Sequence, residues 1–303
     1  SEQTQRRTRR MKNPYMTDEN TLIAFSGGRS SGLMLYKTLE AYDFSLPDNF
    51  AVCFANTGKE LPQTLDFIQR CSDEWGVDIK WLEMWARPAK EEEKNKYKYE
   101  IKVVDHKTAS RNGEPFINLI QLYGTLPNPV ARWCSAHLKT KAIRVYLEEH
   151  LGWESPTQAF IGVRADEDRR ARKLHNNRDE GQDRYCPLFL DGVTKHDVGH
   201  FWESQDFDLE LPNNNGVTDW GNCDLCFLKA AQKKISIIRE RPNLANWWED
   251  VEKEMRDNPL IQGAGGVFRT DHPSYSQMKI IATDQQGFNF LEDDETIPCF
   301  CGD

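Results

Sequence analysis

Apolar and polar residues alternate along the chain in blocks that predict short strands separated by helices. Short apolar or alternating runs predict strands at residues 21–25, 49–55, 77–83, 160–163 and 185–190. Apolar residues at helical spacing predict helices at residues 33–42, 63–75, 194–203, 229–241 and 244–256. Strands that alternate with helices in this way are typical of an α/β fold with a mostly parallel sheet.

Two segments fit this alternation less simply. Residues 86–115 are charged and have no clear period, which predicts a surface insertion, either a solvated face or a lid with a short hairpin. Residues 116–150 have helical patterns on both sides of a break at Pro127 and Pro129. Trp247 and Trp248 lie in the last predicted helix and are expected to be core or interface aromatics.

A turn of small residues follows the first predicted strand. Residues 26–32 read Ser-Gly-Gly-Arg-Ser-Ser-Gly and lead into a helical pattern. Unpaired backbone N–H groups and the helix dipole favour an anion at such a helix start, and glycines allow a ligand to approach the backbone. The turn lacks the Gly-Lys-Ser/Thr ending of the Walker pattern and the Gly-x-Gly-x-x-Gly spacing of the dinucleotide fingerprint. We predict a phosphate or pyrophosphate site.

Polar residues follow two other predicted strands. Residues 56–60 read Asn-Thr-Gly-Lys-Glu, and residues 164–170 read Arg-Ala-Asp-Glu-Asp-Arg-Arg. In parallel sheets, ligands bind beyond the carboxyl ends of the strands. These turns therefore predict a site at that edge of the sheet, together with the loop at residues 26–32.

Charge and composition narrow the class of protein. The net charge is −9, with 38% hydrophobic and 29% charged residues, which is a soluble, globular profile, and no apolar run approaches the length of a membrane span. An acidic chain is a poor non-specific binder of nucleic acid as a whole. Residues 1–12 carry four arginines and one lysine, so we expect a flexible basic arm at residues 1–19, with a nucleic-acid-binding arm as the alternative.

The eight cysteines predict a metal site rather than a disulfide framework, because no secretory signal precedes them. The expected compartment is a reducing cytoplasm. The pair Cys223-x-x-Cys226 has metal-ligand spacing, and Cys299-x-Cys301 offers further thiolates, so a structural Cys₄ zinc site is one interpretation. Free thiols on a C-terminal tail are another. The remaining apolar segments predict packed, inert thiols at Cys53, Cys71 and Cys186.

Five motifs occur in the order found in one known family: residues 25–32, 54–60, 132–139, 162–167 and 222–229. They resemble the N-type ATP pyrophosphatases (PP-loop proteins) and the phosphoadenosine-phosphosulfate (PAPS) reductases, and are most similar to the branch met in phage and bacterial genomes. The resemblance implies an adenine nucleotide α-hydrolase-like, Rossmann-like fold. It has a parallel sheet with helices on both faces, followed here by a mainly helical, cysteine-containing C-terminal region.

The resemblance also implies roles for individual residues. Residues that would hold the phosphates are Ser26, Gly27, Gly28, Ser30, Ser31 and Gly32, and those that would border the adenosine are Phe25, Asn56 and Thr57. Arg29 would partly replace a family lysine. Cations that would neutralise phosphate or sulfate are Arg132, Lys139, Arg164, Arg169 and Arg170. Asp166 and Glu167 would either hold Mg²⁺ or order the arginines by ion pairing.

A cluster of thiolates is the second implied site. Cys134, Cys223, Cys226 and either Cys301 or Cys299 would supply the four ligands of a [4Fe–4S] cluster, with zinc as the rival. Cys299 and Cys301 also stand near the chain end, where the reductases carry a nucleophilic cysteine. Their Glu-Cys-Gly-Leu motif is not matched.

The resemblance leads to a functional hypothesis with two alternatives. We expect an ATP-using enzyme that adenylates a substrate and couples this step to sulfur transfer from a sulfur donor, with a nucleobase in tRNA or DNA as one acceptor. The alternatives are a PAPS reductase that uses a thiol reductant, and a nucleotide-binding Fe–S or zinc partner protein without turnover. No membrane partner is expected, and a homodimer is left open.

The expected organisation has three parts. The basic arm at residues 1–19 precedes a nucleotide-binding α/β domain at residues 20–205, which contains the insertion at 86–115. A helical region with both closely spaced cysteine pairs follows at residues 206–303.

Overall fold

Six strands form a single sheet at the centre of the molecule. The computed structural model describes residues 13–154, 157–176, 182–259, 263–284 and 296–297. The strand order is β4-β3-β2-β1-β5-β6, with bounds β1 Thr21–Ala24, β2 Phe50–Ala55, β3 Ile79–Pro88, β4 Tyr97–Val104, β5 Thr157–Ile161 and β6 Gln182–Tyr185. All neighbours pair in parallel except β3 and β4, which are antiparallel. The predicted α/β class with a mostly parallel sheet is confirmed.

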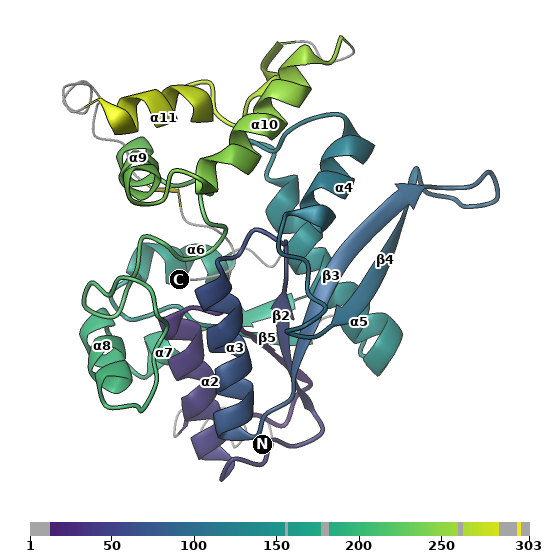
Figure 1. Ribbon diagram of the computed structural model, residues 1–303. Coiled ribbons are helices and arrows are strands. Elements are labelled where there is room, and N and C mark those ends of the chain that lie inside the picture. The colour runs from purple at the N-terminus through teal and green to yellow at the C-terminus, as the bar shows by residue number, and fades with distance from the viewer. Residues whose placement is uncertain (1–12, 155–156, 177–181, 260–262, 285–295, 298–303) are drawn as a thin grey trace.

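Helices cover both faces of the sheet (Figure 1). The helices before residue 204 are α2 Arg29–Ala41, α3 Pro62–Trp75, α4 Glu114–Tyr123, a π-helix Cys134–Lys141, α5 Ala142–Leu151, α6 Asp168–Asn176, α7 Pro187–Leu190 and α8 Lys195–Glu203. Apolar residues of α2 and α3 pack on one face in the larger core, and those of α5 and α6 pack on the other face in a smaller one. Both layers are needed because a parallel sheet is apolar on its two sides.

The C-terminal helices join the larger core. They are α9 Ala231–Glu240, α10 Leu244–Asp257, a 3₁₀ turn Gly263–Gly266 and α11 Tyr275–Thr283. Trp248 is fully buried and packs on Phe116 of α4, Phe268 and Tyr275. This confirms Trp248 as a core residue and joins residues 206–284 to the α/β part through one continuous core.

Two predicted elements differ from the structure, and one expected alternative is present. Residues 187–190 form α7, not a strand, because Pro187 lacks the N–H that a ladder requires and suits the first turn of a helix. The last strand instead ends at Tyr185. The segment 86–115 contains part of a hairpin, as one expectation had it, since β4 pairs antiparallel with β3 along eight residues. The first helix begins at Arg29, inside the small-residue loop, four residues before its predicted start.

Other predictions hold. Thr194 caps α8 in a capping box with Asp197. Cys53 and Cys71 are packed with no exposed surface, and burial raises the pKa of both thiols. Burial likewise raises the pKa of Cys186 to about 11. Within the described residues, none of the helices combines the length and apolar character that crossing a membrane requires.

Candidate functional site

The loop after β1 wraps around the N-terminus of α2. Gly28 is the N-cap, and Gly27 has a φ of 80° with no room for a Cβ, which would lie 2.7 Å from Thr64 Cγ2. The Ser26 and Ser31 hydroxyls lie 2.9 Å apart, and Ser31 Oγ donates to the Gly28 carbonyl at 2.9 Å. These bonds hold the loop closed around the helix start, the arrangement that binds phosphate groups.

Arg164 fixes the side of this loop. Its Nη1 donates to Ser30 Oγ at 3.0 Å, and its guanidinium lies 3.1 Å from Asp166 and 3.4 Å from Glu167. Glu167 also pairs with Arg170 at 2.8 Å. Asp166 and Glu167 therefore order arginines, one of the two predicted roles. Arg169, another of the basic residues expected near the phosphates, is exposed to solvent.

Arg29 and Gly32 both make packing contacts with distant parts of the chain. The Arg29 guanidinium is buried, pairs with Asp208 at 2.7 Å and donates to the Leu211 carbonyl, so its charge is turned away from the loop. A Cβ on Gly32 would lie 2.6 Å from the Trp202 ring, so this glycine lets α2 and α8 approach each other. The loop motif indicated the residue types at these two positions, but not that the Arg29 side chain points away from the loop.

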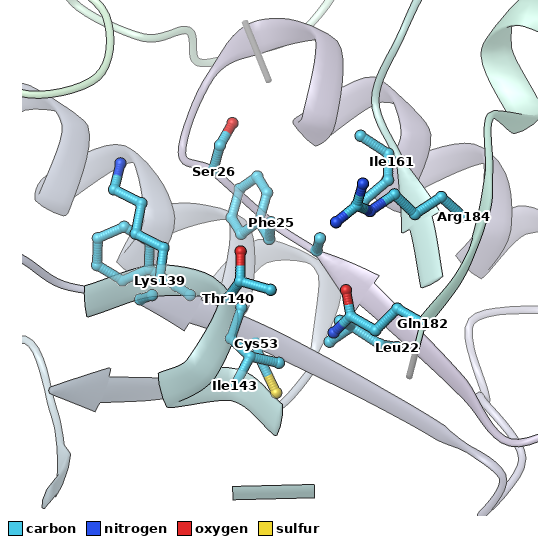
Figure 2. A pocket seen from close by; sticks show the side chains of 13 residues that line it. Leu22, Phe25, Ser26, Cys53, Lys139, Thr140, Ile143, Ile161, Gln182 and Arg184 are labelled. Atoms are coloured by element: carbon cyan, nitrogen blue, oxygen red, sulfur yellow. The ribbon is translucent and has the colours of Figure 1, made fainter. Parts of the chain in front are cut away.

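A cleft of about 580 Å³, partly open to solvent, lies below the loop. Phe25 and Ser26 border it from the loop that follows β1, while Lys139 and Thr140 reach it from the π-helix (Figure 2). Most other walls are apolar, and the lining comprises Leu22, Ala24, Cys53, Phe54, Ala55, Ile143, Ile161, Gln182 and Arg184. An anion loop beside an apolar slot suits a nucleotide, which has a flat base and phosphates.

Gln182 and Arg184 are lining residues that sequence reasoning missed. They alternate with Asp183 on β6 and therefore point to the same face of the sheet. Figure 2 shows both side chains directed into the cleft, opposite Lys139 and Thr140. The alternation Gln-Asp-Arg-Tyr at residues 182–185 could have indicated a strand with these two side chains on one face. It was missed because the strand was expected to begin at Tyr185.

A second cavity, of about 360 Å³, brings three predicted metal ligands together. Cys134 from the π-helix and Cys223 and Cys226 from one loop all line it. Lys139 lines this cavity as well as the cleft below the loop. Thr57, expected beside the adenosine, also lies in this cavity, with its Oγ1 3.5 Å from Cys223 Sγ.

Neighbouring candidates lie outside both cavities. Asn56 is held by the buried carboxylate of Glu83, which accepts from Asn56 Nδ2 at 2.7 Å and from the Ser110 N–H. Asn56 is thus absent from the lining of both cavities as the described residues form them. Arg132 Nε donates to the Pro129 carbonyl at 2.9 Å, beside the π-helix. Cys299 and Cys301 lie outside the described residues.

The loop after β2 is joined directly to the cysteine loop. Lys59 Nζ lies 2.9 Å from Asp224 Oδ2 in a buried ion pair, and the Asp224 N–H donates to the Lys59 carbonyl. Glu60 and Cys223 form an antiparallel bridge, and Lys139 Nζ lies 3.9 Å from Glu60 Oε1. Lys139, which lines both cavities, is therefore linked through Glu60 to the loop after β2 and to the cysteine loop.

The chemistry of the three thiols suits a soft metal or cluster. Burial is the main cause that raises the pKa of Cys223 well above its usual value, while the nearby Lys139 lowers it. In the described part of the chain, however, no group of three or more His, Cys, Asp or Glu side chains is arranged to hold an ion. The donor types therefore fit, whereas the described sulfurs alone do not form a closed site.

The chain is similar to known proteins. An uncharacterized nin region protein of Escherichia phage lambda, ORF290, is 29% identical over 230 residues, which are 76% of this chain and 73% of that protein. The structure of the U34-tRNA thiolase NcsA from Methanococcus maripaludis, solved with its [4Fe–4S] cluster, covers 96% of this chain and 90% of its own. Its TM-score of 0.40 and identity of 15% are too low to transfer a property. The profile of the phosphoadenosine phosphosulfate reductase domain matches residues 20–210, more than half of the sequence, and the chain belongs to this family.

Proposed function

We propose that the protein is an adenine-nucleotide-dependent enzyme of sulfur chemistry, which activates an acceptor by adenylation and couples this step to sulfur transfer. The observation that carries the proposal is the position of Lys139, whose side chain lines both the cleft below the phosphate loop and the three-cysteine cavity. A cation shared by two cavities suits a reaction in which a phosphate and a sulfur nucleophile must meet.

In this mechanism the loop at residues 26–32 binds the β- and γ-phosphates of ATP at the helix start. An oxygen of the acceptor attacks the α-phosphorus, the bond to the bridging oxygen breaks, and pyrophosphate leaves. Lys139 lines the cleft beside Ser26 and would stabilise the charge that develops on the α-phosphate. A sulfur nucleophile then attacks the activated carbon, and AMP leaves with the former acceptor oxygen.

The cysteine cavity would hold the group that presents the sulfur. Cys134, Cys223 and Cys226, with Cys301 or Cys299 as a further ligand, are the residues we assign to a [4Fe–4S] cluster, with zinc as the alternative. When bound, such a group supplies a place where a sulfur atom can be held as a nucleophile. Lys139 and Thr57 border it from the nucleotide side.

The family match supports a second candidate, a reductase acting on PAPS. In that reaction a C-terminal cysteine thiolate, Cys299 or Cys301, would attack the sulfur of the sulfonate, and the nucleoside bisphosphate would leave. A thiol reductant would then release sulfite. Sulfite from PAPS and thioredoxin, with no AMP from ATP, would support the reductase, whereas AMP and pyrophosphate from ATP would support the adenylating enzyme.

The loop is tested by replacing both hydroxyls that close it. We expect Ser26→Ala with Ser31→Ala to lower nucleotide affinity at least about tenfold, because two hydroxyl donors near the phosphates are lost. The measurement is equilibrium binding of ATP, with Ser45→Ala in the exposed turn after α2 as the control. An unchanged ATP affinity in the double variant would overturn the assignment of the loop.

The metal is tested in protein prepared without oxygen. Iron and acid-labile sulfide, with a thiolate-to-iron absorption band that is lost in Cys226→Ala, are the results expected for a cluster. Zinc without iron after anaerobic reconstitution would reject the cluster.

A further inference from the structure

We propose that Gln182 selects the base of the bound nucleotide and makes the cleft specific for adenine over guanine. This inference deepens the proposed function and rests on it, because it requires the cleft to bind a nucleotide. It concerns the end of the cleft that lies farthest from the phosphate loop.

The cleft has a phosphate end and a base end. Ser26 lies at the rim, and Leu22, four residues earlier on β1, lines the same cleft about 13 Å deeper at ~3.3 Å per residue. Between them the walls are apolar and come from three strands and α5: Ala24, Cys53, Ala55, Ile161 and Ile143. Phosphates at the loop would therefore direct the base into an apolar slot.

Gln182 lies at the base end. It is the first residue of β6, pairs in register with Thr157 of β5 and is only 8% exposed. Figure 2 places its amide beside Leu22, far from Ser26, with the Arg184 guanidinium between these two ends. A buried amide that faces an apolar slot is suited to read the polar edge of a flat ligand.

The polar groups that line the cleft favour adenine over guanine. A glutamine amide offers both a donor and an acceptor, which matches the amino group and neighbouring ring nitrogen of adenine. An amide can also pair with the O6 and N1–H of guanine, but the 2-amino group beside them is a further donor that needs another acceptor, such as a carboxylate oxygen. Among the 13 residues that line the cleft in the described part of the chain, none is Asp or Glu. Guanine would leave donors unmatched in a buried slot.

The test compares ATP, GTP and purine riboside triphosphate, which lacks the 6-amino group, by equilibrium binding to the full chain. We expect wild type to prefer ATP over both by about tenfold or more, as for one bidentate pair. Gln182→Leu should reduce both preferences to about threefold or less. Gln182→Glu, whose carboxylate only accepts hydrogen bonds, should weaken the binding of ATP and strengthen the binding of GTP. Gln69→Leu on α3, whose amide bonds to Asp73, is the control and should keep the wild-type preferences.

The outcomes separate this inference from the function it rests on. If wild type binds neither triphosphate, the proposed function fails. If wild type prefers ATP and Gln182→Leu retains that preference in a folded protein, only the role of Gln182 fails. A wild-type preference for GTP that disappears in Arg184→Gln would assign the reading of the base to Arg184 and overturn the inference.

Discussion

Asp224 is the side chain that joins the cysteine loop to the loop after β2 and to α10. Its carboxylate pairs with Lys59, accepts from Trp248 Nε1 at 2.7 Å and caps the Leu225 N–H at 2.7 Å. Lys59 also lies over the Trp247 ring at 4.8 Å. These groups are almost fully buried, so their charges depend on each other for compensation.

Replacing Asp224 by Asn should destabilise the protein by about 3–5 kcal/mol, because it leaves the Lys59 ammonium buried without a counter-charge. Urea unfolding would measure the loss. Asp191→Asn, which breaks a half-exposed pair with Lys37, is the control and should cost less than about 1 kcal/mol. Equal losses in the two variants would contradict the argument from burial.

The buried thiol of Cys53 should make the free energy of unfolding decrease at high pH. Burial raises the pKa of its thiol above the ordinary value of 9.0. Because the folded-state pKa lies above the unfolded one, the thiol contributes stability that is fully present below pH 9 and is lost as the pH rises through the folded-state pKa. Cys53→Ala should therefore lose less unfolding free energy than wild type between pH 8 and 10. Parallel pH profiles in urea titrations would refute this.

The sequence indicated the types of residue at the site more readily than the directions of their side chains and their packing partners. The sequence singled out Ser26 and Lys139, and both line the cleft. It did not indicate the packing partners of Arg29, Gly32 and Asn56, because Asp208, Trp202 and Glu83 lie 179, 170 and 27 positions away along the chain. Such contacts depend on how distant elements pack, which a local pattern does not contain.

At the scale of elements, the π-helix Cys134–Lys141 determines which side chains share the site. Residues five positions apart are about 140° apart around an α-helix, but in a π-helix they are joined by an i→i+5 hydrogen bond and lie nearly in line. Cys134 and Lys139 both line the cysteine cavity for this reason. The sequence predicted a helix here, but no simple period distinguishes one extra residue per turn.

The contact between α2 and α8 leaves no room for a side chain at position 32. Gly32→Ala should destabilise the protein by about 1–3 kcal/mol, because its Cβ would collide with the Trp202 ring. Thermal unfolding would measure the effect, and Trp202→Phe in the same chain should recover part of it by removing the colliding ring atoms. A shift in nucleotide affinity without loss of stability would instead support the phosphate-binding role expected from the motif.

On the scale of the whole molecule, the class and most of the parallel sheet could be predicted, because buried strands and helices alternate clearly. The outer strands could not. β4 lies in a charged segment half exposed to solvent, and β6 has only four residues. Neither carries the apolar pattern of a central strand.

Because Lys139 lines both cavities, we expect their ligands to affect each other. Saturating ATP should slow the release of metal from the cysteine site to a chelator by about fivefold or more, the lower range of coupling between sites. Thr57→Val, which removes the hydroxyl beside Cys223 and Glu60, should reduce this protection. Thr38→Val, which removes a hydroxyl bonded within α2, should not. Absence of protection in wild type would show that the two sites are independent, whereas equal protection in all three proteins would exclude only the role of Thr57 in the coupling.

The sheet order also constrains how the chain can fold. β1 pairs on one side with β2, close in sequence, and on the other with β5, where Thr21 and Gln158 are 137 residues apart. The closure of so long a loop is an entropic cost that must be met before the central pairing forms, so folding is expected to be slow. During synthesis, β1, β2 and β3 emerge well before β5. The nucleotide cleft, bordered by both β1 and β5, can therefore form only after most of the chain has been made.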